Sequence, residues 1–331
     1  MVWVIFILSS AVIVYAAIKL AAYGDAISIR TGLGGMFIGL ILMASATSLP
    51  EFLTTIQSIR QNVPDLAAGN MFGSNMFNML LLALIDFMAY RTRVLRKVAR
   101  RHALSGSIAI LMAALAVFFV LANLPFKIGW VGVDSLVIIL AYLGGLWIIQ
   151  RESGSSAKVD LEDEAKEKDG LPGMFEAVLG FSLATAALVL VMPSLVSSSK
   201  EIAEITGLGT GFIGTALVGV ITSLPELVAT AAAIRQKVYD MAIGNLFGSN
   251  MFNMFALALA DFFFLDGRFI GVIDPNFVLV GIIGLLMTVM GLIGNLARLE
   301  RRLLFIEADA FFIIVTYFLG MWLIYTRSIG I

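Results

Sequence analysis

The sequence predicts an all-α integral membrane protein with about ten transmembrane helices, arranged as two inverted repeats of five helices. Three features support this fold class: an apolar composition, a series of long apolar stretches, and an internal repeat at a constant offset. Of the 331 residues, 60% are hydrophobic and only 14% are charged, whereas soluble domains are about half apolar and about a quarter charged. The composition is therefore that of a membrane protein and argues against a soluble enzyme.

The chain lacks side chains on which many enzymes depend. It contains no cysteine and one histidine, His102. Thiolate chemistry, zinc sites built from cysteine and histidine, Ser-His-Asp triads and bis-histidine haem ligation all need residues that are missing here. We therefore expect no enzymatic activity and no cofactor.

Long apolar stretches predict the membrane spans. A helix that crosses a bilayer needs about 20 mostly apolar residues. The first stretch has neither a basic start nor a small-residue cleavage site, so we interpret it as a retained helix rather than a signal peptide. The ten stretches cover residues 2–22, 35–59, 64–90, 104–123, 128–150, 174–197, 211–234, 240–264, 277–297 and 303–326.

The distribution of basic residues predicts the orientation. If loops alternate between sides, fifteen Lys and Arg residues fall on one side and five on the other, leaving aside Lys19 and Arg30 in the first hairpin. The positive-inside rule makes the richer side cytoplasmic. An even number of spans then places both termini outside a prokaryotic-type plasma membrane. The polar stretch Ser153–Asp169 is rich in Glu, Asp and Lys and lacks aromatic residues, which is typical of a solvated cytoplasmic linker.

The strongest feature of the sequence is an internal repeat. Residues 47–78 and 222–253 are identical at 21 of 32 positions when position 47 is aligned with position 222. The best-matched motifs are T-S-L-P-E, at 47–51 and 222–226, and G-N-x-x-G-S-N-x-x-N, at 69–78 and 244–253. Equivalent positions of the two copies are separated by a constant number of residues, which we call the repeat offset. The same offset also pairs matching residues outside these motifs, so it predicts a duplicated unit of five spans.

An odd number of spans per unit requires that the second copy enter the membrane from the opposite side. The halves are then related by a pseudo-twofold axis in the membrane plane, the plan of many secondary transporters, in which the substrate binds near the midplane. A duplicated structural membrane protein is the alternative. We assign residues 1–150 to the first repeat, 151–172 to the cytoplasmic linker and 173–331 to the second, inverted repeat.

Both repeated motifs are poorly suited to a plain membrane helix. Pro50 and Pro225 each remove a backbone donor, so we expect broken helices there. Irregular backbone at membrane depth is tolerated where it is buried in protein or lines a hydrated cavity, and its carbonyls can then face a cation. Glu51 and Glu226 follow the two prolines. A carboxylate near the bilayer centre costs about 3 kcal/mol or more, so the pair predicts a functional site; a purely structural interhelical hydrogen bond is the alternative.

The oxygen-bearing residues of the two motifs indicate a hard cation. Two carboxylates, two opened carbonyls and neutral hydroxyl and amide oxygens approach the roughly six to eight oxygens that calcium takes, whereas magnesium holds its waters and demands octahedral geometry. Transition metals normally use imidazole or thiolate ligands. The same oxygens can hold sodium ions or protons in place of calcium, as exchange requires. The predicted ligands are Glu51, Glu226, the backbone at Thr47 and Thr222, Ser48, Ser223, Ser74, Ser249, Asn78 and Asn253.

Other polar residues have simpler interpretations. The small residues of the second motif can also serve close helix packing, and we expect Thr54 and Ser58 to be packing groups. The basic run Arg91–Arg101 is a topology signal that contacts anionic lipid, and no nucleic acid is expected as a partner. Six aspartates near span ends are expected to cap helices or form ion pairs: Asp65, Asp86, Asp134, Asp240, Asp261 and Asp309.

The paired motifs resemble the two alpha repeats of the calcium/cation antiporter superfamily, most closely its sodium/calcium exchanger family of the prokaryotic type. The resemblance covers both halves and essentially all ten spans. It implies that spans two, three, seven and eight form the ion-binding core, and that spans one and six slide across it to switch access. It also implies that Glu51 and Glu226 bind calcium.

Two departures from that family are visible. Ala46 and Ile221 stand where members usually have glycine, so helix unwinding is expected to be less pronounced. Asn78 and Asn253 occupy the last motif position, where sodium/calcium exchangers commonly carry an acidic residue in one repeat. Only two carboxylates therefore remain in the centre.

We predict a secondary antiporter that exchanges Ca2+ for Na+ by alternating access. Its partners are the transported cations and membrane lipid, and we expect it to function as a monomer. A proton can replace sodium as the counter-ion, because buried carboxylates can be protonated near neutral pH. A cation channel is the third alternative, since the same ring of oxygens in a continuous pore would conduct.

Overall fold

The computed structural model describes residues 1–31, 44–88, 94–153, 172–235, 239–297, 302–303 and 306–328. Within these ranges, nine helical segments are long and apolar enough to cross a membrane, and they coincide with nine of the ten predicted stretches. The other predicted stretch, 35–59, is described only from residue 44 onward. Residues 154–171 of the predicted linker lie outside the described ranges.

The elements of the two halves follow the same order. The first half contains α1 (Val2–Thr31), α3 (Leu49–Arg60), α4 (Pro64–Met88), α5 (Val94–Ala122), β1 (Lys127–Ile128), β2 (Val131–Gly132) and α6 (Val133–Ser153). The second half contains α8 (Met174–Thr206), α9 (Thr210–Ile213), the π-helical turn η1 (Gly214–Val218), α10 (Gly219–Thr222), α11 (Leu224–Arg235), α12 (Tyr239–Ala260), the 3-10 turn η2 (Asp261–Phe263), α13 (Phe269–Val272), the 3-10 turn η3 (Pro275–Phe277), α14 (Val278–Ala297), β3 (Arg302–Leu303), β4 (Ile306–Glu307) and α15 (Ala308–Ser328).

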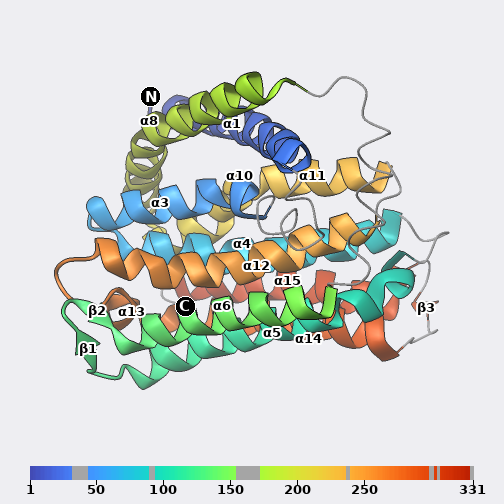
Figure 1. Ribbon diagram of the computed structural model, residues 1–331. Coiled ribbons are helices and arrows are strands. Elements are labelled where there is room, and N and C mark those ends of the chain that lie inside the picture. The colour runs from blue at the N-terminus through green and yellow to red at the C-terminus, as the bar shows by residue number, and fades with distance from the viewer. Residues whose placement is uncertain are drawn as a thin grey trace.

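The repeat offset seen in the sequence is also an offset of structure. Helices α3 and α11 begin and end at equivalent positions, as do α6 and α15. The antiparallel hairpins β1–β2 and β3–β4 also occupy equivalent positions. Figure 1 shows β1 and β2 at the left end of the molecule and β3 at the right end. The two halves therefore have the inverted arrangement that an odd number of spans per repeat requires.

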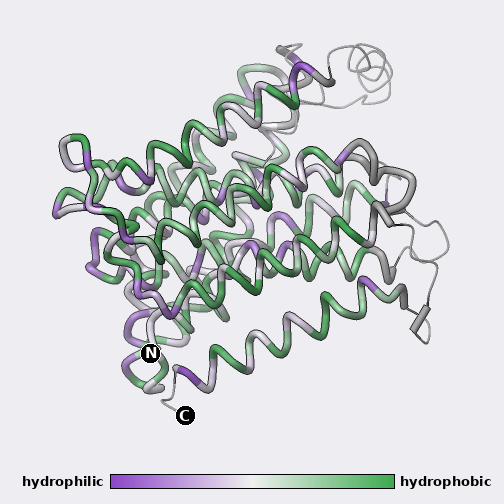
Figure 2. The backbone as a smooth tube through the Cα atoms, turned by 90° about the horizontal axis from the view of Figure 1, so that it is seen from below, coloured by the Kyte–Doolittle hydropathy of each residue, from purple (hydrophilic) through white to green (hydrophobic). Residues whose placement is uncertain are grey.

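Helices α1 and α8 pack against each other on one side of the molecule, across the top in Figure 1. Their contact is an apolar cluster that includes Ile13, Leu20, Leu188 and Leu195. Helices α4 and α12 run through the middle, and α5, α6, α14 and α15 lie on the far side from α1 and α8 (Figure 1). The helices are largely hydrophobic along their length (Figure 2), as spans that face lipid or an apolar interior require.

The helices that carry the second motif are the enclosed ones. We compare the share of each helix's 18-residue apolar stretch that is buried within the protein. This share is 94% in α4 and 78% in α12, compared with 22% in α8 and 28% in α15. Glycines allow the close approach: a Cβ on Gly69 would lie 2.3 Å from the carbonyl oxygen of Gly211, and one on Gly73 would lie 2.7 Å from the Cα of Thr215. The small residues of the first repeat thus serve packing as well as placing the polar groups of α4.

Three of the predicted spans begin at other positions than the sequence indicated. The fifth and tenth were expected to begin at residues 128 and 303, but each is preceded by a short hairpin, so the helices begin at Val133 and Ala308. In the first hairpin, Gly129 adopts φ +65°, a left-handed conformation that suits glycine in a tight turn. Helix α5 begins at Val94, inside the basic run, because a helix can continue past the apolar stretch into water.

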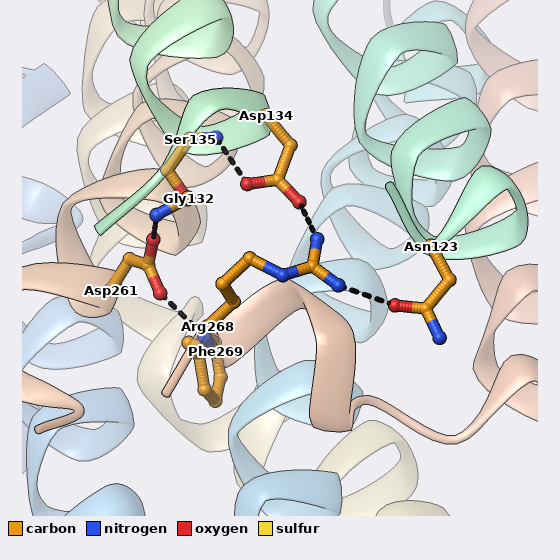
Figure 3. A network of polar contacts seen from close by, with 7 residues as sticks. All are labelled: Asn123, Gly132, Asp134, Ser135, Asp261, Arg268 and Phe269. Atoms are coloured by element: carbon orange, nitrogen blue, oxygen red, sulfur yellow. Dashed lines mark hydrogen bonds and ion pairs between the residues drawn. The ribbon is translucent and has the colours of Figure 1, made fainter. Parts of the chain in front are cut away.

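An ion pair joins the two halves beside the first hairpin (Figure 3). Asp134, in the first turn of α6, accepts a hydrogen bond from the Ser135 N–H at 2.9 Å and pairs with Arg268 at 2.8 Å. Arg268, just before α13, also donates to the side-chain oxygen of Asn123 at 2.6 Å. The Asp134 side chain is fully buried and the Arg268 side chain is 13% exposed. This contact ties α6 and the end of α5 to the second half.

Asp261 makes a second link in the same region (Figure 3). Its carboxylate accepts hydrogen bonds from the backbone N–H groups of Gly132, at 2.7 Å, and Phe269. The predicted roles in capping and ion pairing are confirmed for Asp134 and Asp261. The side chains of Asp86 and Asp240 lie outside the described part of the chain.

We predict that Arg268→Met lowers the free energy of unfolding by about 3–5 kcal/mol, because it leaves the buried Asp134 carboxylate without its cation. The measurement is thermal unfolding of the purified protein in detergent. Arg268→Met combined with Asp134→Asn is expected to recover most of the loss, and Lys127→Met on the exposed hairpin is the control. Unfolding of the single variant at the wild-type temperature would contradict a stabilising ion pair.

Candidate cation-binding site

Each central glutamate lies in the first turn of a helix that follows a break. Helices α3 and α11 both begin one residue before the proline of the T-S-L-P-E motif. The preceding residues, Ser48 and Ser223, leave the helical conformation with φ −91° and ψ 7° or 6°. Proline is tolerated in a first turn because its missing N–H has no helical acceptor there. Glu51 and Glu226 therefore lie at the positive end of a helix dipole, which attracts negative charge.

The two breaks are short. The Ser48 N–H still bonds to the Ala44 carbonyl at 2.9 Å, and the Ser223 N–H bonds to the Gly219 carbonyl at 3.2 Å. Helical bonding therefore continues up to the break, and only one residue on each side departs from it. This limited unwinding agrees with the absence of glycine immediately before the motif. Each proline lacks the N–H that would bond to the carbonyl four residues earlier, which is that of Ala46 in the first half and Ile221 in the second.

The carboxylates are held by serines from both halves. Ser223 donates to Glu51 Oε1 at 2.9 Å, and Ser48 donates to Glu226 Oε1 at 2.9 Å. A serine of α4 or α12 completes each set: Ser74 lies 3.5 Å from Glu51 Oε1, and Ser249 lies 3.3 Å from Glu226 Oε1. The contacts in one half repeat those in the other. Both glutamates are fully buried, so this arrangement fixes two carboxyl groups inside the protein.

Four asparagines link α4 to α12 in the same way. Asn78 donates to the side-chain oxygen of Asn250 at 3.0 Å, and Asn253 donates to that of Asn75 at 3.0 Å. Asn75 and Asn250 in turn donate to each other's backbone carbonyls, at 3.4 and 3.5 Å. These reciprocal amide bonds, which we call the amide clamp (Asn75, Asn78, Asn250, Asn253), set the separation of the two helices beside the glutamates.

The threonines that precede the breaks also reach across to the other half. Thr222 donates to the Asn70 side-chain oxygen at 3.0 Å, and Thr47 lies 3.5 Å from the Asn245 side-chain oxygen. Both threonines are fully buried. Their hydroxyl groups thus hold the ends of the broken helices in place beside the two carboxylates. The sequence predicted the backbone carbonyls of these two threonines, and not their hydroxyl groups, as cation ligands.

The site contains four buried oxygens without a protein partner. They are Glu51 Oε2, Glu226 Oε2, Asn78 Oδ1 and Asn253 Oδ1, and all four side chains are fully buried. An unsatisfied buried acceptor costs about 1–3 kcal/mol, and more when it is charged. The four oxygens form two symmetry-related pairs, so they belong to one site. A bound cation would satisfy these acceptors and remove the free-energy cost of burying them.

The donor set suits a hard cation. All ten predicted ligand residues lie in the described part of the chain. They offer carboxylate, carbonyl, hydroxyl and amide oxygens, which are the donor atoms that hard cations prefer. Among the described residues, no cluster of three or more His, Cys, Asp or Glu side chains is present. An oxygen-only site with two carboxylates matches a divalent alkaline-earth ion or small monovalent cations.

Two polar residues of α3 have the packing role that the sequence indicated. Ser58 donates to the Thr54 carbonyl at 2.8 Å, and the Thr54 hydroxyl contacts the Met192 sulfur of α8 at 3.1 Å. The neighbouring Thr55 hydroxyl is buried without a partner. Thr55 was not singled out in the sequence.

Four further asparagines of the site were missed: Asn70, Asn75, Asn245 and Asn250. They lie within the repeated motifs and are paired by the repeat offset, so the repeat contained the signal. Their contacts with the opposite half could not be read from the sequence, because they depend on how the two copies face each other.

Comparison with known proteins identifies the family. The sequence profile of the family described as "Sodium/calcium exchanger protein" matches residues 1–150 and 176–326, which covers both halves. The chain belongs to this family. Both copies of the motifs that surround Glu51 and Glu226 lie within the matched ranges.

Relatives and solved structures agree with this assignment. The chain is 25% identical over 251 residues to Inner membrane protein YrbG of Escherichia coli, covering 73% of each chain, and 27% identical over 266 residues to Sodium/calcium exchanger MaX1 of Methanosarcina acetivorans, covering 69% of this chain and 73% of that one. The fold is similar to that of the H+/Ca2+ exchanger CAX, with TM-score 0.72, 13% identity and coverage of 99% and 85%. It is also similar to that of the sodium-calcium exchanger NCX_Mj, with TM-score 0.62, 20% identity and coverage of 97% and 99%. The protein is a multi-pass membrane protein with the exchanger fold.

We predict that calcium stabilises the purified protein through the two glutamates. A ligand at about 100 times its dissociation constant adds about 2.7 kcal/mol to the free energy of unfolding, so the unfolding temperature in detergent should rise with added calcium. Glu51→Gln and Glu226→Gln should each remove most of that rise. Glu176→Gln, an exposed first-turn glutamate of α8, is the matched control. An equal rise in all three variants would place calcium elsewhere.

Proposed function

We propose that the protein is a secondary active antiporter that exchanges Ca2+ for Na+ by alternating access, and not an enzyme. The observation that carries this proposal is the pair of buried glutamates, one from each inverted half, whose free oxygens are accompanied by the free oxygens of Asn78 and Asn253. In the calcium-bound form of the protein, calcium would coordinate these oxygens. In the sodium-bound form, sodium ions would coordinate the same oxygens.

Competition for the two glutamates supplies the coupling. An uncompensated charge buried in a low-dielectric interior costs several kcal/mol, so a protein with empty carboxylates should not pass readily through an occluded state. A cation binds whichever access state is open to its side, and its loading permits the switch. Exchange then follows without any covalent chemistry.

The arrangement of helices supports a sliding pair. The apolar cluster of α1 and α8 extends onto the core, where it includes Leu66, Ile213 and Val218. The glutamates instead contact the hydroxyl groups of Ser48, Ser74, Ser223 and Ser249.

Polar contacts do join α8 to the core: Gln61 bonds with Pro193 and Ser197, and Thr54 contacts Met192. Because the apolar part of this surface makes few directional bonds, we infer that α1 and α8 can move across the core once these contacts are exchanged. We therefore propose that this pair opens the site to one side at a time.

A proton is the second candidate for the counter-ion. Each glutamate leaves Oε2 free, and this oxygen can carry a proton instead of facing a metal ion. The similarity of fold to an H+/Ca2+ exchanger is compatible with this alternative. The mirrored helix breaks favour alternating access over a continuous pore.

The proposed location is the plasma membrane, with both termini outside and the linker 151–172 in the cytoplasm. The supporting observation is the excess of basic residues on one side of the predicted spans. Transported cations and membrane lipid are the proposed partners, and the transport unit is a monomer because both halves of the site belong to one chain.

The transport assay is uptake of radiolabelled calcium into proteoliposomes. We expect an outward sodium gradient to drive uptake at clamped membrane potential. Uptake driven only by an outward proton gradient would make the proton the counter-ion. Uptake that needs neither gradient and follows potential alone would identify a channel and overturn the proposal.

Substitution of either glutamate should remove that activity. Glu51→Gln and Glu226→Gln each leave a divalent cation with one carboxylate in the occluded site, so calcium uptake should fall to the level of protein-free liposomes. Glu176→Gln should retain wild-type uptake. Normal calcium flux in either central variant, at equal protein content, would show that the site lies elsewhere.

Orientation can be tested because the chain has no native cysteine. We expect a membrane-impermeant maleimide to label Lys127→Cys, on the exposed hairpin, in intact cells. Ser155→Cys, in the linker, should react only after the membrane is made permeable. The reverse pattern would contradict the orientation.

A further inference from the structure

Three polar contacts join α8 to the end of α3, which lies beside it at the left of Figure 1. The Gln61 side chain, which follows α3, donates to the Pro193 carbonyl at 3.1 Å and accepts a hydrogen bond from the Ser197 hydroxyl at 3.1 Å. The Thr54 hydroxyl of α3 contacts the Met192 sulfur at 3.1 Å. We call these contacts the α8 latch (Thr54, Gln61, Met192, Pro193, Ser197).

We propose that the α8 latch holds the protein in one of its two access states, and that the other access state has no equivalent latch. The inference rests on the proposed function, and specifically on the movement of α1 and α8 across the core. It makes the two access states unequal in free energy even when no cation is bound.

The first step is a comparison of the latch with the other half. The repeat offset applies to α1 and α8, because these helices end at the equivalent residues Thr31 and Thr206. Gln61 is repeated as Gln236, which lies outside the described part of the chain. At three latch positions, the equivalent residue of the other half is alanine: Ala229 for Thr54, Ala17 for Met192 and Ala22 for Ser197. Alanine has neither a hydroxyl group nor a sulfur atom, so two of the three contacts have no counterpart.

The second step is the turn of α8 to which the latch binds. Pro193 lies inside α8, so the carbonyl of Val189 lacks its helical donor. Met192 and Ser197 flank this proline, and the residue of α1 equivalent to the proline is Ile18. The latch therefore holds α8 at the place where proline weakens the helix, and α1 has neither the proline nor the matching side chains.

The third step is the burial of one latch contact. Thr54 is fully buried, and Met192 is 1% exposed. A hydrogen bond fails when its two heavy atoms are more than about 3.5 Å apart, so movement of α8 past α3 breaks this contact. The Thr54 hydroxyl then loses its acceptor inside the protein, and an unsatisfied buried donor costs free energy.

The symmetry of the fold extends this local difference to the whole protein. The pseudo-twofold axis of inverted repeats relates the two access states by exchanging the roles of the two halves. Identical halves would therefore give two states of equal free energy. Because the latch contacts stabilise one state alone, we expect the empty protein to populate that state, the one seen in the structure, more than the other.

The test measures the populations of the two states in the purified protein without calcium or sodium. Nitroxide labels are attached to Glu201→Cys, near the end of α8, and to Arg235→Cys, at the end of α11. Both side chains are exposed, and the chain has no native cysteine. The predicted topology places the two labels on opposite sides of the membrane, so movement of α8 changes the distance between them. Pulsed electron paramagnetic resonance gives the share of molecules at each distance.

Four conservative variants remove parts of the latch: Thr54→Val, Gln61→Met, Met192→Leu and Ser197→Ala. One net hydrogen bond corresponds to about a two- to tenfold change in an equilibrium constant. Each variant should therefore lower the population at the distance expected from the structure, relative to the other population, by about that factor. Ser182→Ala is the matched control, because Ser182 is an exposed serine of α8 that donates to the Val178 carbonyl of its own helix.

Each outcome decides the inference. A lower share at the distance expected from the structure in the four variants, with the control at the wild-type share, supports the α8 latch. Unchanged shares in the four variants overturn it. The proposed function is tested separately, because absence of calcium uptake by the wild type under both sodium and proton gradients overturns antiport whichever label distances are found.

Discussion

The structure depends on one electrostatic constraint: two carboxylates are buried at the centre of a membrane protein with half of their oxygens unsatisfied. Burial of such groups is costly without a compensating cation. Glu51 and Glu226 come from opposite halves, and each is oriented by a serine of the other half. The binding site therefore exists only when the two repeats are packed together.

Most other features of the core maintain that packing. The prolines end the preceding helical segments so that each glutamate falls in a first turn, and the glycines of α4 admit the backbone of α9 and η1 at close range. The amide clamp joins α4 to α12 beside the carboxylates. Near the first hairpin, Arg268 and Asp261 connect the halves again (Figure 3). Rigid links within the core contrast with the largely apolar surface on which the α1–α8 pair packs against the core, and this is the surface suited to the proposed sliding.

The sequence predicted the fold class well because its signals are strong and independent. Apolar stretches located the spans, and the constant repeat offset implied inversion through an odd number of spans. Short features were harder. The hairpins β1–β2 and β3–β4 were read as helix, because two-residue strands at the start of an apolar stretch leave almost no periodic pattern.

The centre of the site was predictable in part. Proline followed by glutamate at membrane depth is costly in both copies, which is why Glu51 and Glu226 stood out. Asn75 and Asn250 did not, because an amide inside a small-residue motif is equally compatible with packing. Their contacts depend on the facing helix, and the cross-half bonds from Ser48 and Ser223 depend on the same information. Tertiary geometry between repeats is what a linear pattern lacks.

The most direct test of the account is the position of a divalent cation in crystals soaked with strontium, located by anomalous scattering. We expect one peak bridging Glu51 Oε2 and Glu226 Oε2, with no equivalent peak in the Glu51→Gln/Glu226→Gln variant. A peak outside the two glutamates, or one that persists in the variant, would contradict the assignment of this site.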